Sequence, residues 1–357
     1  GAIPWRKALR LARVRRLPAP RWMHRAVRAV AAPLGLAAPL HEVDRTRYSW
    51  TVSGDRARSS LDFSPRDSSA EAVVRLSPRA QGSRGGQARG ATFDEFGLDA
   101  ERIGGWRRRH IRFLHDAYWR VEVEGTRNLP RRGAGVMVGV HRGFMPFDGV
   151  MVVHDVVGAT GRYPRFLIHP ALVKFPFLAN YMFKLGGIIA CRENADYVLQ
   201  RDGLLAVFPE GIRGAFSLYR DAYRISGFGR PDYVRLALRH RAPIIPFVTV
   251  GSAEIFPIFK KVDWRWWERL TEWPCFPLTP TFPLLPVPLP SKWHTEYLEP
   301  IAVQEQYPPE AASNPETVAR IDAQVQSIVA AKLQELLRAR PSIWYGSVFE
   351  KEMNHAG

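Results

Sequence analysis

The stretch Val138–Val153 reads VGVHRGFMPFDGVMVV. Its first residues are small and apolar, as in a buried strand, and a loop that carries Gly143 and Pro146 follows them. A second apolar run begins at Asp148 and is typical of a helix. The stretch therefore predicts a strand, a loop and a helix, with His141 at the end of the strand and Asp148 at the head of the helix.

The pair formed by His141 and Asp148 has two interpretations. In the first, His141 is a loop histidine and Asp148 caps the helix. In the second, the histidine is a base and the carboxylate orients it. Histidine suits this role because its ordinary pKa lies near neutral pH. A carboxylate on the other ring nitrogen would fix the tautomer and stabilise the imidazolium.

Strands and helices alternate on both sides of this stretch. Short apolar runs predict strands at residues 119–125, 134–140, 164–169, 186–191, 204–208 and 243–250. Helical patterns cover residues 101–118, 147–157, 176–186, 193–203, 231–241 and 315–340. The alternation predicts an α/β fold with a largely parallel central sheet flanked by helices. The strands are almost continuously apolar, which indicates that both faces of the sheet are covered.

The composition limits the classes of partner and of bound group. Lys and Arg number 51 against 34 Asp and Glu, which gives a net charge of +17 over 357 residues. This charge indicates an anionic partner, either nucleic acid, an acidic membrane surface or a phosphorylated substrate. Two cysteines, Cys191 and Cys275, cannot build a disulfide framework. The histidines show no metal-ligand spacing, so we expect no metal site.

Two N-terminal segments differ in composition from the predicted sheet region. Residues 1–52 are basic, and the first 41 hold nine Lys or Arg and no acidic residue. Their helical pattern predicts an amphipathic helix in contact with an anionic membrane. A helix docked on the protein's own core or a transit-type presequence would show the same pattern. Residues 53–92 are rich in Ser, Arg, Gly and Ala, which is typical of a flexible linker.

A segment rich in tryptophan and proline follows the last predicted strand. Five tryptophans lie between residues 264 and 293 among many prolines, so no regular helix is expected beyond Trp273. Tryptophan favours membrane interfaces. The segment is therefore expected to contact lipid or an acyl chain, or else to cover the sheet as an ordered loop.

Four short stretches fall at strand ends or in loops, where open α/β sheets place their active sites. They are HRGFMPFD (141–148), GGIIACR (186–192), FPEGIRG (208–214) and APIIP (242–246). Their order and spacing resemble the glycerolipid acyltransferase family, the lysophospholipid acyltransferase-like enzymes, over roughly residues 93–300. The stretches FDEFGLD (93–99) and PFDG look more like the bacterial and plant branch of monoacylglycerol and diacylglycerol acyltransferases.

The spacing of the first stretch departs from that family. The usual pattern has four residues between the histidine and the aspartate, whereas six residues separate His141 from Asp148. Gly143 and Pro146 are expected to fold the two extra residues outward and to return Asp148 to His141.

The resemblance implies a glycerol-3-phosphate acyltransferase-like fold, with an acyltransferase domain at residues 93–303 and a C-terminal helix and tail at residues 304–357. It implies acyl transfer from acyl-CoA or acyl-carrier protein to a glycerolipid hydroxyl, with no cofactor beyond that co-substrate. The implied catalytic residues are His141 and Asp148, and the implied substrate-binding residues are Arg192, Glu210, Gly211 and Arg213. The resemblance also implies a peripheral protein on the cytoplasmic face of a membrane.

Three other functions stay open on the sequence. A nucleic-acid-binding protein would explain the charge, although the basic residues are dispersed and no binding motif is present. An inactive relative that only binds lipid, or a lipid hydrolase with water as the acceptor, would keep the same fold. The acceptor is open as well, since Arg213 suits a phosphorylated lipid such as lysophosphatidic acid, and the branch resemblance suits a neutral mono- or diacylglycerol.

Overall fold

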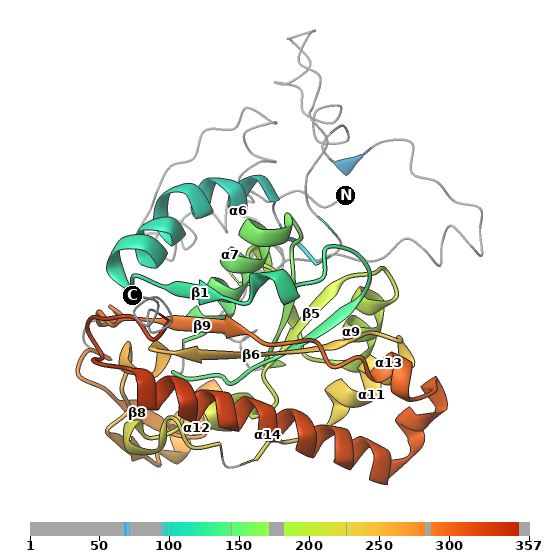
Figure 1. Ribbon diagram of the computed structural model, residues 1–357. Helices are drawn as coiled ribbons and strands as arrows, with labels where there is room; N and C mark the ends of the chain where they lie inside the picture. Colours follow the sequence, from blue (N-terminus) through green and yellow to red (C-terminus); the bar gives the residue numbers. More distant parts are fainter. Residues whose placement is uncertain are drawn as a thin grey trace, which may run out of the picture. The chain divides into compact units, whose positions relative to one another are not determined.

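The computed structural model describes residues 68, 69, 71, 94, 96–98, 100–143, 145–170, 182–225, 227–282 and 287–349 (Figure 1). The chain divides into two units, Gly1–Ile103 with Phe175–Leu185 and Gly104–Lys174 with Gly186–Gly357. The basic segment predicted at residues 1–52 lies outside the described residues, as do nearly all of the predicted linker and most of the predicted helix 176–186. The sheet and the predicted site residues belong to the second unit.

The second unit contains a sheet of seven strands in the order β1-β9-β6-β2-β5-β3-β4. The strands are β1 (Glu122–Glu124), β2 (Gly135–Val138), β3 (Arg165–Ile168), β4 (Gly187–Ile189), β5 (Leu204–Val207), β6 (Ile244–Val250) and β9 (His294–Tyr297). Every neighbouring pair is parallel except β6 and β9, which are antiparallel. The prediction of a largely parallel sheet is therefore confirmed, and each of the six predicted strands is present.

The central strands of this sheet are buried and mostly apolar. All four residues of β2 and all seven of β6 are buried, as expected for strands covered on both faces. The register pairs Val138 of β2 with Val207 of β5 on one side and with Pro246 of β6 on the other. Since all three strands are parallel, their carboxyl ends meet at one edge of the sheet.

Helices precede, separate and follow the strands along the described part of the chain. They are α6 (Ala100–Trp106), α7 (Phe147–Thr160), α9 (Arg192–Leu199), α10 (Gly211–Ala215), α11 (Asp232–Arg239), α12 (Arg265–Thr271), α13 (Val303–Gln306) and α14 (Pro315–Ala339). The connection from β2 to β3 through α7 and the connection from β5 to β6 through α11 run in opposite directions along the sheet. Right-handed connections therefore place α7 and α11 on opposite faces, and α14 lies on the face of α11 (Figure 1).

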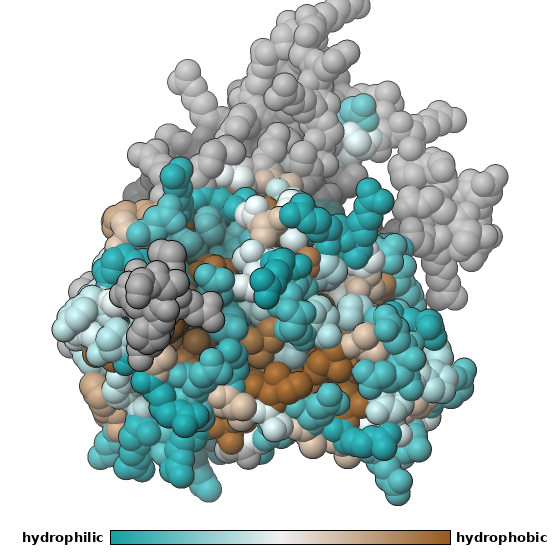
Figure 2. Space-filling model, in the orientation of Figure 1, coloured by the Kyte–Doolittle hydropathy of each residue, from teal (hydrophilic) through white to brown (hydrophobic). Residues whose placement is uncertain are grey.

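Helix α14 is the longest helix described, and its sequence explains both its start and its face. The Asn314 side chain accepts hydrogen bonds from the backbone N–H groups of Glu316 and Thr317 at 2.9 and 3.2 Å, so it caps the helix. Its buried residues recur every three or four positions and are Val318, Ile321, Val325, Val329, Leu333 and Leu336. Figure 2 shows hydrophobic residues gathered along the line where this helix meets β6.

Several short elements were not predicted from the sequence. Two segments with wider helical turns, Arg107–Ile111 and Phe113–Tyr118, replace the second half of the helix predicted at 101–118. A hairpin of β7 (Lys260–Val262) and β8 (Phe276–Leu278) encloses α12 within the tryptophan-rich segment. Short 3-10 turns lie at Thr126–Asn128, Tyr219–Asp221, Ser252–Glu254 and Pro309–Ser313. In the described part of the chain no helix is long and apolar enough to cross a membrane.

Strand β9 was also missed, although it lies between β1 and β6. Trp293, just before it, is fully buried and stacks on Trp119 with 4.7 Å between ring centroids. This tryptophan belongs to the segment for which lipid contact or coverage of the sheet was expected, and it forms part of the core. His294, the first residue of β9, is likewise fully buried.

The stability of the protein should fall as the pH drops below neutrality, in part because of His294. Burial lowers the pKa of His294 to about 4, whereas an unfolded histidine titrates near its ordinary pKa of about 6.5. Between these two values the unfolded chain binds a proton that the folded chain does not bind. Stability is therefore lost with falling pH in this window, by up to about 1.4 kcal/mol per pH unit.

Urea unfolding at several pH values between neutrality and pH ~4 measures this effect. His294→Asn should lose less stability with falling pH than the wild type does. The same exchange at the exposed His110 is the control. An unchanged dependence of stability on pH in His294→Asn would show that the buried His294 does not cause this loss.

Candidate active site

The loop after β2 brings His141 and Asp148 into contact. The Nδ1 atom of His141 lies 2.6 Å from Oδ2 of Asp148. The same oxygen accepts the backbone N–H of Arg142 at 3.0 Å, and Oδ1 accepts the backbone N–H of Gly149 at 2.8 Å. Asp148 is buried in the first turn of α7, where the helix dipole favours a negative charge. The carboxylate is thus fixed in position and stabilised as an anion.

The shape of this loop explains how six intervening residues still allow the contact. Gly143 has a φ of +86°, in the left-handed region that favours glycine. A Cβ atom there would also lie 3.3 Å from the backbone oxygen of Ser252. Pro146 ends the loop directly before α7. The loop therefore returns Asp148 to the histidine, as the sequence predicted for this longer spacing.

The other ring nitrogen of His141 remains available. The side chain is 15% exposed, and its ring lies 5.3 Å from that of Phe208 at the end of β5. Within the described ranges, no protein group forms a hydrogen bond to Nε2. An aspartate that accepts from Nδ1–H leaves Nε2 as the basic atom. His141 can thus accept a proton from a bound hydroxyl at the carboxyl edge of the sheet.

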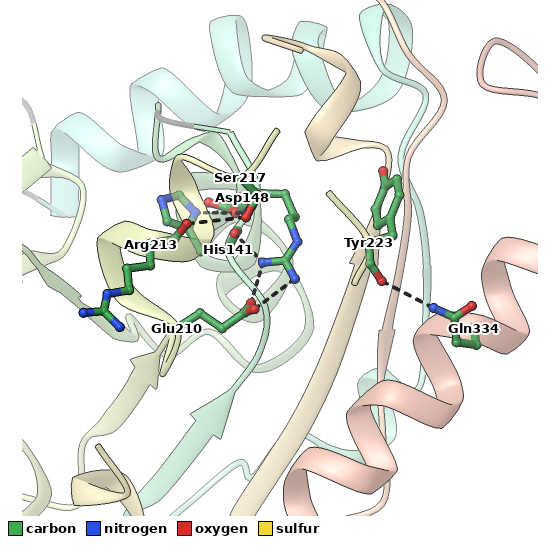
Figure 3. Close-up of polar contacts among 8 residues, drawn as sticks. His141, Asp148, Glu210, Arg213, Ser217, Tyr223 and Gln334 are labelled. Atoms are coloured by element: carbon green, nitrogen blue, oxygen red, sulfur yellow. Dashed lines mark hydrogen bonds and ion pairs between the residues drawn. The ribbon is translucent and has the colours of Figure 1, made fainter. Parts of the chain in front are cut away.

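A buried ion pair joins this loop to the FPEGIRG stretch (Figure 3). Arg142 donates from Nη1 to Oε2 of Glu210 and from Nη2 to Oε1 at 3.1 Å, and both side chains are buried. Nη1 also donates to the backbone oxygen of His141 at 2.9 Å. Both Glu210 oxygens therefore accept from Arg142, so Glu210 connects the two loops.

Glycines allow the two loops to approach. A Cβ atom on Gly214 would lie 2.8 Å from Cβ of Glu210 and 3.2 Å from Nη1 of Arg142. A side chain at this position would push the loops apart. Gly211 differs, because a Cβ atom there would meet nothing within 4 Å, and its φ of +56° places it in the left-handed region. Gly211 thus sets the turn into α10 and leaves open space beside it.

The two arginines predicted to bind substrate are exposed. Arg192 begins α9 and lies 3.4 Å from Asp196, measured from Nε to Oδ2. Arg213 lies in α10, and its backbone oxygen accepts the Ser217 hydroxyl at 3.4 Å. In Figure 3 the Arg213 guanidinium extends away from the His141–Asp148 pair. The structure thus brings His141, Asp148 and Glu210 together, while neither arginine contacts that pair.

A second polar cluster lies further along α7, around Asp155. Asp155 is buried and accepts the Tyr297 hydroxyl at 3.2 Å. Nε2 of His115 lies 3.2 Å from the other Asp155 oxygen. Burial raises the pKa of Asp155 and lowers that of His154 to about 4. The irregular helical turns at Phe113–Tyr118 cover this part of α7, and the rings of His115 and His154 lie 4.7 Å apart. The described residues hold no group of three or more His, Cys, Asp or Glu that could bind a metal ion.

Comparison with known proteins identifies the family of the chain. A family model described as Acyltransferase matches residues 120–250. An uncharacterized protein of Mycobacterium tuberculosis is 38% identical over 260 residues, which cover 71% of this chain and 72% of that protein. A Bos taurus protein described as a DGAT1/2-independent enzyme synthesizing storage lipids is 27% identical over 48% of this chain and 51% of its own length.

A solved structure, the 1-acyl-sn-glycerophosphate acyltransferase of Thermotoga maritima, aligns with a TM-score of 0.41 and 21% identity over 66% of this chain and 79% of that chain. The family match covers β1 to β6, and thus both the loop of His141 and the loop of Glu210. The chain belongs to the acyltransferase family of the glycerolipid type and is an O-acyltransferase.

Proposed function

We propose that the protein moves a fatty acyl group from acyl-CoA or acyl-carrier protein to a hydroxyl of a glycerolipid, with His141 as the general base. The observation that carries this proposal is the 2.6 Å contact between His141 Nδ1 and Asp148 Oδ2. It leaves Nε2 basic and oriented in a partly exposed position. The bovine relative, described as synthesizing storage lipids, supports a neutral glycerolipid as the acceptor.

The proposed reaction follows from these positions. His141 Nε2 removes the proton from the acceptor hydroxyl while the hydroxyl oxygen attacks the thioester carbonyl carbon. Asp148 stabilises the imidazolium that forms. The tetrahedral intermediate then collapses, the carbon–sulfur bond breaks, and the thiolate takes the proton from His141. The products are an ester and a free thiol, and the step needs no metal and no cofactor beyond the acyl donor.

The positive charge of the protein supports an acidic donor and a membrane-bound acceptor. Acyl-CoA and acyl-carrier protein are both anionic. Arg192 is exposed at the start of α9, and Arg213 is exposed on α10, which begins directly after Glu210. A guanidinium can hold a phosphate or glycerol oxygens through a fork of donors. We assign both arginines to substrate binding. We also place the protein on the cytoplasmic face of a membrane, where its anionic partner is lipid rather than nucleic acid.

Asp148→Asn should lower the rate of transfer by about 10²–10⁴-fold. An amide at this position would still contact the ring, but it could not stabilise the imidazolium and would favour the wrong tautomer. Initial rates with labelled acyl-CoA measure the loss, with lysophosphatidic acid, monoacylglycerol and diacylglycerol as separate acceptors.

The matched control for this variant is Asp232→Asn. Asp232 also lies in the first turn of a helix, α11, but it is exposed. The control should keep the wild-type rate on whichever acceptor is used. Equal rates for Asp148→Asn and the wild type would remove Asp148 from the mechanism. Release of free fatty acid in place of ester would instead identify a hydrolase.

A further inference from the structure

Five exposed hydrophobic side chains gather in the segment that contains β7, α12 and β8. They are 37% to 63% exposed and are Phe259, Trp264, Trp266, Leu270 and Leu278, here called the aromatic patch. The backbone N–H of Phe259 bonds to the backbone oxygen of Leu278 at 3.0 Å, and the rings of Trp264 and Trp266 stack at 5.8 Å. Contiguous exposed apolar side chains of this size mark an interaction surface.

The inner side of this segment packs against the rest of the segment. The exposed side chains of the patch therefore belong to an ordered surface. The ring of Trp267 on α12 lies 4.9 Å from that of Phe276 on β8 and 5.8 Å from that of Trp273. Thr271, one turn further along α12, is buried. Helix α12 is thus held by one side, while Trp266 and Leu270 are exposed on another side.

The basic and acidic residues of α12 lie on different sides of the helix. At about 100° per residue, Trp266 and Leu270 form one side of the helix, and Arg265 and Arg269 lie about 100° from it. The glutamate within α12, Glu268, lies on the side opposite Trp266 and Leu270. The apolar side is therefore flanked by two cations, while the carboxylate of Glu268 lies on the opposite side.

Two further cations lie at the edge of the patch. Lys260 and Lys261 on β7 are exposed next to Phe259. Neither lysine, nor Arg265 or Arg269, forms an ion pair with a carboxylate in the described part of the chain. Such cations can interact with anionic head groups while the apolar side chains enter the acyl boundary.

We propose that the aromatic patch docks the protein onto an anionic phospholipid bilayer. Tryptophan favours the interface between head groups and acyl chains, and each nearby Lys or Arg adds attraction to an anionic surface. The inference rests on the proposed function, because a membrane lipid is the proposed acceptor.

The segment that carries the patch contacts the residues that follow the loop of Glu210. The backbone N–H of Tyr219 bonds to the backbone oxygen of Ile258 at 2.9 Å, directly before Phe259. The ring of Phe216, at the end of α10, lies 5.4 Å from that of Trp273. Helix α10 begins directly after Glu210, so docking through the patch places the loop of Glu210 beside the lipid surface from which the acceptor comes.

Vesicle flotation with the full chain tests this proposal. The probes are phosphatidylcholine vesicles with and without phosphatidylglycerol, and the variant is Trp266→Ala with Leu270→Ala. The control pair, Trp344→Ala with Tyr345→Ala, removes exposed aromatic side chains outside the patch. We expect the patch variant to bind anionic vesicles at least ~10-fold more weakly than the wild type, and the control pair to bind like the wild type.

Two results would overturn the proposal: unchanged vesicle binding by the patch variant, or an equal loss in the control pair. A patch variant that binds vesicles normally but no longer forms a dimer seen by light scattering would assign the patch to a second copy of the chain instead.

Measurements of activity separate this test from the proposed function. The patch variant should lose transfer to vesicle-embedded acceptor and keep it on a water-soluble short-chain acceptor. If the wild type binds vesicles through the patch but transfers no acyl group, the docking surface is supported and the proposed transferase function is rejected.

Discussion

Replacing His141 by alanine should lower the rate of acyl transfer by at least about 10²-fold, since general-base catalysis contributes about 10²–10⁴-fold. The ring lies at the end of β2 with Nδ1 held by Asp148 and Nε2 available. Without it, the acceptor hydroxyl would have to lose its proton to water. Because the proposed role is in the chemical step, kcat should fall while KM for the acyl donor changes little.

Steady-state rates with purified wild type and His141→Ala measure this effect. The matched control is His154→Gln, which changes a histidine on α7, two turns after Asp148. The control should keep the wild-type kcat, and circular dichroism should show both variants folded. A folded His141→Ala variant with wild-type kcat would rule out His141 as the base.

The second large effect concerns stability. Glu210→Ala should lower the free energy of unfolding by about 3–5 kcal/mol, because it leaves the Arg142 guanidinium buried without its partner. Arg142 is only 1% exposed, so water cannot replace the lost carboxylate. The same guanidinium donates to the backbone oxygen of His141. Loss of the pair should therefore also lower kcat.

Urea unfolding of Glu210→Ala, Arg142→Met and the double variant Arg142→Met with Glu210→Leu measures this coupling. The double variant should be less destabilised than Glu210→Ala, because it leaves no unpaired buried charge. Arg192→Ala is the control, since Arg192 is exposed in its ion pair with Asp196, and this pair should contribute at most about 1 kcal/mol. A loss below about 1 kcal/mol in Glu210→Ala would mean that Arg142 finds water or another partner.

The sequence predicted the parts of the fold that local patterns determine. The apolar runs of β2 and β6 are long enough to be recognised as buried strands, and α14 has both a capping residue, Asn314, and a regular apolar face. Strand β9 reads HTEY and has no such pattern. It is a strand because its backbone pairs with both β1 and β6, and that tertiary pairing is invisible in a single segment.

The same limit applies to the site. His141 and Asp148 are near in sequence, and a strand–loop–helix stretch is enough to suggest their contact. Arg142 and Glu210 are 68 positions apart. Glu210 was expected to accept from a hydroxyl or to hold an arginine in place, but the sequence did not show that this arginine is Arg142. The charged residue directly after His141, with an opposite charge in the FPEGIRG stretch, was the signal that could have indicated this pair.

The most direct test of the central claim is a balance of products from the wild-type protein. Purified protein is incubated with labelled acyl-CoA and each glycerolipid acceptor, and free thiol and labelled ester are quantified together. We expect one thiol released for each ester formed with at least one acceptor, and no labelled fatty acid in excess of a protein-free blank. Thiol released together with free fatty acid, or no release with any acceptor, would contradict it.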